Sequence, residues 1–157
     1  MRRALHRGRD AGQRGFTLME LIVATIILVV LTAMVIPVAR VAIMREKERE
    51  LRRDLWEMRD AIDRYKDAAD RGAFTITLGT DGYPKTLEKL VEGEDVGGKK
   101  VRFLRKIPVD PMTGKAEWGM RSMEDDPDSD SWGGQNVFDV YTTSQGTGLD
   151  GTKYKDW

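Results

Sequence analysis

The chain of 157 residues contains no cysteine and a single histidine, His6, and this scarcity limits its chemistry. Without cysteine there is no disulfide framework and no thiolate nucleophile. His6 lies in a basic N-terminal stretch, so the rest of the chain lacks both residue types. Cysteine–histidine and serine–histidine–aspartate catalysis, together with the usual zinc ligand sets, are therefore excluded for that part. Oxygen-ligand metals and carboxylate chemistry remain open.

A strong excess of one charge sign occurs only at the N-terminus. The 26 basic and 26 acidic side chains cancel, yet the first 15 residues hold five arginines and one aspartate. The remainder is therefore mildly acidic. Such a body offers no basic surface of the kind that binds phosphates, and we expect no nucleic acid partner.

Charge is almost absent from the next segment, residues 16–39, where Glu20 is the only ionisable side chain. A helix of this length extends about 36 Å, enough to cross about 30 Å of hydrocarbon with some tilt. The arginines before it predict a cytoplasmic N-terminus, with the rest of the chain across the membrane. A cleaved secretory signal is the alternative, but this run is longer and continues through Pro37 into a charged helix.

Glu20 and Pro37 are the two irregular positions in this run. An unpaired carboxylate at membrane depth is costly, so Glu20 requires a cationic partner or a position near the interface. Pro37 has no N–H to donate and disfavours a straight helix, although membrane helices tolerate such a kink.

The stretch "RGFTLMELIVATIILVVLTAMVIP" resembles the class III signal of type IV pilin-like proteins. It has a basic leader ending in glycine, then an aromatic residue, threonine, leucine and a glutamate. The resemblance implies that a prepilin peptidase cuts between Gly15 and Phe16 and methylates the new amino group of Phe16. It further implies that Glu20 neutralises the terminal ammonium of a neighbouring subunit during assembly. By the same resemblance, the chain near Pro37 unwinds when subunits pack.

Alternatives remain for both positions. Phe16 and Glu20 are four residues apart on one helical face, so the charge pair can form within one chain. A carboxylate that reaches the membrane interface needs no partner. For Pro37 the alternative is a simple kink.

Residues 45–71 form a strongly charged segment with one apolar stripe. No glycine occurs between Phe16 and Arg71, so we expect one continuous helix through both segments. The stripe covers about three heptads, which favours packing on the chain's own globular region over a coiled-coil seam. Its residues recur at alternating spacings of four and three: Leu51, Leu55, Met58, Ile62, Tyr65 and Ala69.

Composition changes at Gly72, after which most glycines and prolines lie. We expect a short helix in "YPKTLEKLVEG", opening near Pro84 and closing at Gly93. The stretches "VRFLRKIP", "KAEWGM" and "NVFDVYTT" have the composition of short strands. The predicted class is α+β, with a long N-terminal α-helix packed on a small antiparallel β-sheet and a glycine-rich C-terminal loop.

"YPKTLEKLV", "IPVDPMTG", "DSWGGQNVFDVYT" and "GLDGTKYKDW" are similar to the G-type major pseudopilin of type II secretion systems. That resemblance implies a calcium ion in the C-terminal loop, with Asp150 and Asp156 as the candidate ligands. The alternative is a tight turn capped by Asp150. "GTGLDG" matches a dinucleotide-binding pattern, but too few residues follow for the required helix and strand, and we reject it.

The resulting division is a basic prepilin leader (1–15), a transmembrane and assembly helix (16–39), an amphipathic stalk (40–71) and a periplasmic globular region (72–157). The resemblance implies a non-enzymatic subunit of a type II secretion pseudopilus, stored in the bacterial inner membrane as a single-pass protein. Its expected partners are membrane lipid, prepilin peptidase, further copies of itself in a filament, minor pseudopilins and an inner-membrane assembly platform.

Three alternatives stay open. Within the superfamily, the chain is a type IV pilin or competence pseudopilin subunit. Outside it, the chain is a membrane-tethered carboxylate hydrolase, which the lack of histidine and cysteine disfavours. The third is a calcium-responsive binding module on a stalk.

Overall fold

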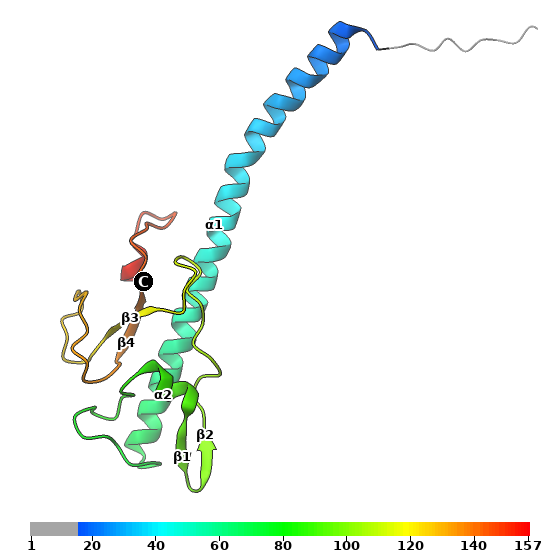
Figure 1. The fold of residues 1–157 in the computed structure, drawn as a ribbon. Helices are drawn as coiled ribbons and strands as arrows, with labels where there is room; N and C mark the ends of the chain where they lie inside the picture. The colour runs from blue at the N-terminus through cyan, green and yellow to red at the C-terminus, as the bar shows by residue number, and fades with distance from the viewer. Residues whose placement is uncertain (1–15) are drawn as a thin grey trace, which may run out of the picture. The chain divides into compact units, whose positions relative to one another are not determined.

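The computed structural model describes residues 16–157 (Figure 1). The chain divides into two compact units, residues 1–41 and 42–157. A long helix followed by short elements makes the fold α+β, which confirms the predicted class. The elements in chain order are α1 (Leu18–Asp70), α2 (Leu87–Glu92), β1 (Glu94–Val96), β2 (Lys99–Val101), β3 (Trp118–Arg121), β4 (Asp139–Thr142) and the 3₁₀ helix η1 (Tyr154–Asp156).

Helix α1 is one element of 53 residues, as the lack of internal glycine predicts. It ends where Gly72 adopts a φ of 68°, a left-handed conformation that costs glycine nothing sterically. The Gly72 N–H donates to the carbonyl oxygen of Ala69 (2.9 Å), and the Ala73 N–H donates to that of Ala68 (3.0 Å). This is the hydrogen-bond pattern of a Schellman cap. The composition change at Gly72 therefore marks the true end of the helix.

One face of the second half of α1 forms the core of the unit at residues 42–157. All six residues of the predicted stripe are buried there, with at most 7% of any side chain's surface exposed. Five of them, all but Ala69, pack in one cluster with Leu87 and Leu90 of α2, Trp118 of β3 and Val140 of β4. The prediction that the stripe packs on the chain's own globular region is confirmed. The coiled-coil alternative is wrong for these residues, because the face is already covered.

The strands pair as two separate antiparallel ladders. β1 and β2 form a hairpin whose turn residues, Gly97 and Gly98, have φ values of 61° and 82°. Such values suit a tight hairpin turn and are readily adopted by glycine. β3 and β4 pair with Trp118 opposite Thr142. Strands were expected in "KAEWGM" and "NVFDVYTT", but the hairpin was not, although its Gly-Gly pair was a signal for it.

The predicted strand in "VRFLRKIP" is wrong beyond Val101. The N–H groups of Phe103 and Leu104 both donate to the carbonyl oxygen of Leu90, each at 3.0 Å. This bonding fastens the backbone to the end of α2 and turns both side chains into the core. The expected short helix is present as α2 and closes at Gly93, as predicted.

Asp110, in the turn of "IPVDPMTG", is a fully buried carboxylate that joins this turn to β4. Its Oδ1 accepts the N–H of Met112 at 2.8 Å, and its Oδ2 accepts the hydroxyl of Thr142 at 2.5 Å. Because Thr142 is itself buried, removing the carboxylate leaves its hydroxyl without this acceptor in the interior.

We expect Asp110→Ala to lower the free energy of unfolding by about 2–4 kcal/mol, because two donors lose a charged acceptor. Asp128→Ala is the matched control, since Asp128 is exposed. Urea unfolding of the full chain in detergent, followed by tryptophan fluorescence, measures both. Equal stability of the two variants would show that the buried contact is energetically unimportant.

Candidate functional site

The first part of α1 presents an exposed apolar surface. The apolar side chains described between residues 16 and 41 are all exposed, Phe16 to 82% and Leu18 to 75%. Apolar surface of this extent is favourable against hydrocarbon or another protein, and unfavourable in water. Within residues 16–157, α1 is the one helix that is long and apolar enough to cross a membrane.

The hydroxyl groups in this segment are satisfied inside the helix itself. Thr25 Oγ1 donates to the carbonyl oxygen of Ile22 at 2.8 Å, and Thr32 Oγ1 donates to that of Leu28 at 2.7 Å. In hydrocarbon no water is available, so polar groups must find partners within the protein. These two threonines are therefore compatible with a lipid environment.

The start of α1 is capped by a side chain that the sequence analysis does not identify. Thr17 Oγ1 accepts the N–H of Glu20 at 3.2 Å, and the Thr17 carbonyl oxygen accepts the N–H of Leu21 at 3.1 Å. Thr17 is thus the N-cap, and Glu20 occupies the third helical position. Threonine followed three residues later by glutamate is the spacing of a capping box, which was the available signal.

Glu20 therefore stabilises the start of α1, in addition to the ion pair expected from the sequence. An acidic side chain in the first turn interacts favourably with the positive end of the helix dipole. Within residues 16–157 the Glu20 carboxylate has no hydrogen-bond or ion-pair partner. The predicted pairing with a terminal ammonium, in the same chain or a neighbouring one, stays a prediction.

Of the other predicted N-terminal site residues, the structure describes Phe16 and Pro37 but not Gly15. Gly15 and the whole predicted leader, residues 1–15, lie outside the described residues. Phe16 precedes α1, and Pro37 lies inside it with helix on both sides. The helix thus continues through the proline, and the unwinding expected on assembly stays a prediction.

The glycine-rich C-terminal loop, residues 144–157, is fastened to α1 by three charged side chains. The first is Glu48, whose Oε1 accepts the N–H of Leu149 at 2.8 Å and the hydroxyl of Tyr154 at 3.1 Å. One carboxylate oxygen therefore holds two points of the loop. We refer to Glu48, Arg52 and Arg59 as the clasp residues.

Arg52, one turn further along α1, makes two different contacts with the loop. Its guanidinium nitrogen lies 3.2 Å from Oδ2 of Asp150, and its Cζ lies 3.7 Å from the ring centroid of Trp157. The first contact is a half-exposed ion pair, which alone contributes little. The second is a cation–π contact, so one side chain engages both a carboxylate and an aromatic face.

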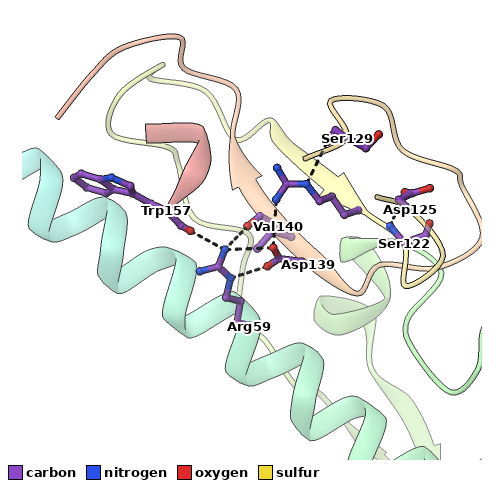
Figure 2. Close-up of polar contacts among 8 residues, drawn as sticks. Arg59, Ser122, Asp125, Ser129, Asp139, Val140 and Trp157 are labelled. Carbon is purple, nitrogen blue, oxygen red and sulfur yellow. Dashed lines mark hydrogen bonds and ion pairs between the residues drawn. The ribbon is translucent and has the colours of Figure 1, made fainter. Parts of the chain in front are cut away.

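Arg59 joins three segments of the chain (Figure 2). Its Nε donates to Oδ1 of Asp139 at 2.7 Å. A terminal guanidinium nitrogen donates to the carbonyl oxygens of Val140 (3.1 Å) and Trp157 (2.8 Å). The helix, strand β4 and the last residue of the loop are thereby held by one partly buried cation.

The loop is also closed on itself at two glycines. Gly148 donates to the carbonyl oxygen of Thr152 at 2.8 Å, and Tyr154 donates to that of Gly146 at 3.1 Å. A Cβ at Gly148 would lie 2.7 Å from the Trp157 ring, and one at Gly146 would lie 2.9 Å from Tyr154. The glycines of "GTGLDG" thus permit close packing of two aromatic rings, which agrees with rejection of a nucleotide site.

Asp150 forms the tight turn named above as the alternative to a calcium ligand. Its Oδ1 accepts the N–H of Thr152 at 3.0 Å and the Thr152 hydroxyl at 2.6 Å, while Oδ2 faces Arg52. Calcium takes six to eight oxygen ligands. Within residues 16–157 no group of three or more carboxylate, histidine or cysteine side chains could hold a metal. The Asp150 carboxylate is thus engaged by Thr152 and Arg52, and the calcium site expected at Asp150 and Asp156 stays a prediction.

The sequence analysis does not identify the clasp residues, although a signal was present. Each lies beside or one turn from a member of the apolar stripe: Arg52 follows Leu51, and Arg59 follows Met58. Charged residues at the edges of a buried stripe are placed to reach whatever packs on it. What each charge would reach could not be read from spacing alone.

Comparison with known proteins identifies the N-terminal segment. Residues 10–36 match a family described as "Prokaryotic N-terminal methylation motif". The matched range includes Gly15, Phe16 and Glu20, and ends one residue before Pro37. Searches of curated proteins and of solved structures found no match.

The hydroxyl and N–H of Thr152, with a smaller contribution from Arg52, hold the pKa of Asp150 below its ordinary value. A carboxylate of this kind stabilises the closed loop above its unfolded pKa, about 3.9. That contribution disappears as the pH falls through the lower pKa of the folded loop.

We therefore expect Asp150→Asn to weaken loop closure by a constant amount from neutral pH down to about pH 4, and by less below that pH. The indole N–H signal of Trp157, which donates to Thr152 Oγ1, reports the closed loop by NMR. Asp128→Asn is the control for general acid effects. A difference between wild type and Asp150→Asn that is the same at every pH would contradict this assignment.

Proposed function

We propose, from the methylation motif at residues 10–36 and the apolar helix within it, that this chain is a prepilin-type subunit that assembles into a filament. The motif supports placement in the type IV pilin superfamily and processing by a prepilin peptidase. The carrying observation is that cleavage signal, Glu20 and apolar run occur in one register. No catalytic constellation is needed for such a role.

The chemistry of this proposal starts at the cleavage site. Cutting between Gly15 and Phe16 removes the basic leader and creates an amino group at Phe16, whose unmodified pKa is near 7.7–8.0. N-methylation leaves that group basic. The new cation lies four residues before Glu20, at the end of a helix whose apolar surface is exposed. Cleavage thus supplies the positive charge that the carboxylate lacks.

The exposed apolar surface of α1 can be covered first by lipid and then, after assembly, by neighbouring subunits. Before assembly, hydrocarbon covers the side chains of residues 16–39, with the N-terminus cytoplasmic and the globular region in the periplasm. After assembly, the same side chains pack against neighbouring copies. Glu20 then pairs with the Phe16 ammonium of the next subunit, because a buried carboxylate is stable only when paired.

Within this class we favour the pseudopilus of a type II secretion system, in which a short periplasmic filament drives protein export. The resemblance of the C-terminal stretches to the G-type major pseudopilin supports this choice. Minor pseudopilins and an inner-membrane assembly platform would then be its partners. A type IV pilin or competence pseudopilin uses the same N-terminal chemistry and is the second candidate.

We expect co-expression with a prepilin peptidase to yield a mature chain that begins at Phe16 with a methylated amino group. Mass spectrometry of the purified N-terminus measures both events. The matched control is expression with a catalytically inactive peptidase, which should leave residues 1–15 attached and unmethylated. A mature chain that begins at any other residue would overturn the proposal.

We expect Glu20→Ala to leave cleavage intact and to reduce filament yield below detection, because the terminal cation then lacks its carboxylate. Glu20→Gln should behave alike, since it keeps the side chain's size and removes its charge. Glu46→Ala is the control, an exposed acid on the same helix beyond the apolar run. Electron microscopy of sheared filaments measures assembly. Normal filaments from Glu20→Gln would show that the charge is dispensable.

A further inference from the structure

The C-terminal loop brings an anion and an aromatic face to the same side of α1. Oδ2 of Asp150 and the ring of Trp157 both meet the Arg52 guanidinium, at 3.2 Å and 3.7 Å. A planar, weakly hydrated guanidinium can pair with a carboxylate and stack on a ring at once. Calcium, in contrast, requires a shell of six to eight oxygens. The local geometry therefore matches an arginine side chain.

Several oxygens around Asp150 are already used as hydrogen-bond acceptors. Oδ1 of Asp150 accepts two hydrogen bonds from Thr152, and Oε1 of Glu48 accepts two from Leu149 and Tyr154. The carbonyl oxygens of residues 146, 148 and 152 each accept a backbone N–H of the loop. A metal ion could gain these ligands only by breaking the hydrogen bonds that shape the loop.

We propose that the guanidinium of Arg52 is the cation that holds the C-terminal loop closed on α1, and that the loop closes without a bound metal. Because Arg52 belongs to α1, closure depends on the helix that also carries the core stripe. Glu48 holds Leu149 and Tyr154 of the same loop, and Arg59 holds its last residue, Trp157, so the clasp acts along one side of the helix.

The calcium response of filaments, unlike loop closure itself, rests on the proposed function. A loop held by an arginine is independent of calcium concentration, so the folded subunit and its filaments should form in calcium-depleted medium. The half-exposed ion pair is screened by salt, whereas the stacking contact with Trp157 is screened less. Loop closure should therefore respond to ionic strength more than to calcium.

The test is hydrogen exchange of residues 146–157 in the full chain in detergent, compared in excess EDTA and in excess calcium. The N–H of Leu149 donates to Glu48 of α1 and reports closure on the helix, while the N–H groups of Thr152 and Tyr154 donate within the loop and report its internal turns. In the wild type we expect the same protection under both conditions. Exchange in Arg52→Met should be roughly tenfold faster under both conditions, because an ion pair and a cation–π contact are lost.

Arg53→Met is the matched control, since Arg53 contacts Glu50 and Asp54 of its own helix and should leave loop exchange unchanged. Protection around Met58 should be equal in all three proteins, which shows that the core is intact. The inference is overturned if the wild-type loop is protected only with calcium, or if Arg52→Met exchanges like Arg53→Met. Neither result depends on processing or assembly, so failure here leaves the filament proposal standing.

Discussion

The packing of one face of α1, from Leu51 to Ala69, is the contact on which the folded body of the protein depends. Every other described element of that unit is short, and helix α2 and the four strands have three to six residues each. Short elements cannot persist alone, because ordering them costs more free energy than their own hydrogen bonds return. α2, β3, β4 and η1 are stable because the helix presents a continuous apolar surface on which each of them buries a side chain, whereas the β1–β2 hairpin contributes none to this core.

Charges at the edges of this surface determine how the C-terminal end of the chain is held. Arg59 joins α1 to β4 and to Trp157, while Glu48 and Arg52 hold the loop that precedes Trp157. Each of these charges has its partner in the same chain. Glu20 differs, since no partner lies within residues 16–157 and its surroundings are apolar. The charges with partners inside the fold serve its stability, whereas the pairing of Glu20 with the Phe16 ammonium belongs to the proposed assembly.

Much of this architecture could be predicted from patterns that are local in sequence. The apolar run, the stripe and the break at Gly72 follow from periodicity and composition, because a helix repeats its faces every three to four residues. Local patterns were less reliable for strands. "VRFLRKIP" has a strand's composition, but Phe103 and Leu104 bond to the end of α2 instead. The Thr17 capping box and the Gly97–Gly98 turn are likewise local patterns that predict a helix start and a hairpin.

By itself, the sequence determined the fold class, the membrane-length helix, the face that is buried and the position of Glu20 within the methylation motif. These depend on neighbours along the chain. Only the tertiary structure decided which partners the charges meet. The resemblance implies a metal-ligand role for Asp150, and only the structure shows that its carboxylate faces Arg52, almost a hundred residues earlier. The physical reason is that ion pairs and ring contacts depend on distance in space, and spacing along the chain constrains that distance only within one helix or turn.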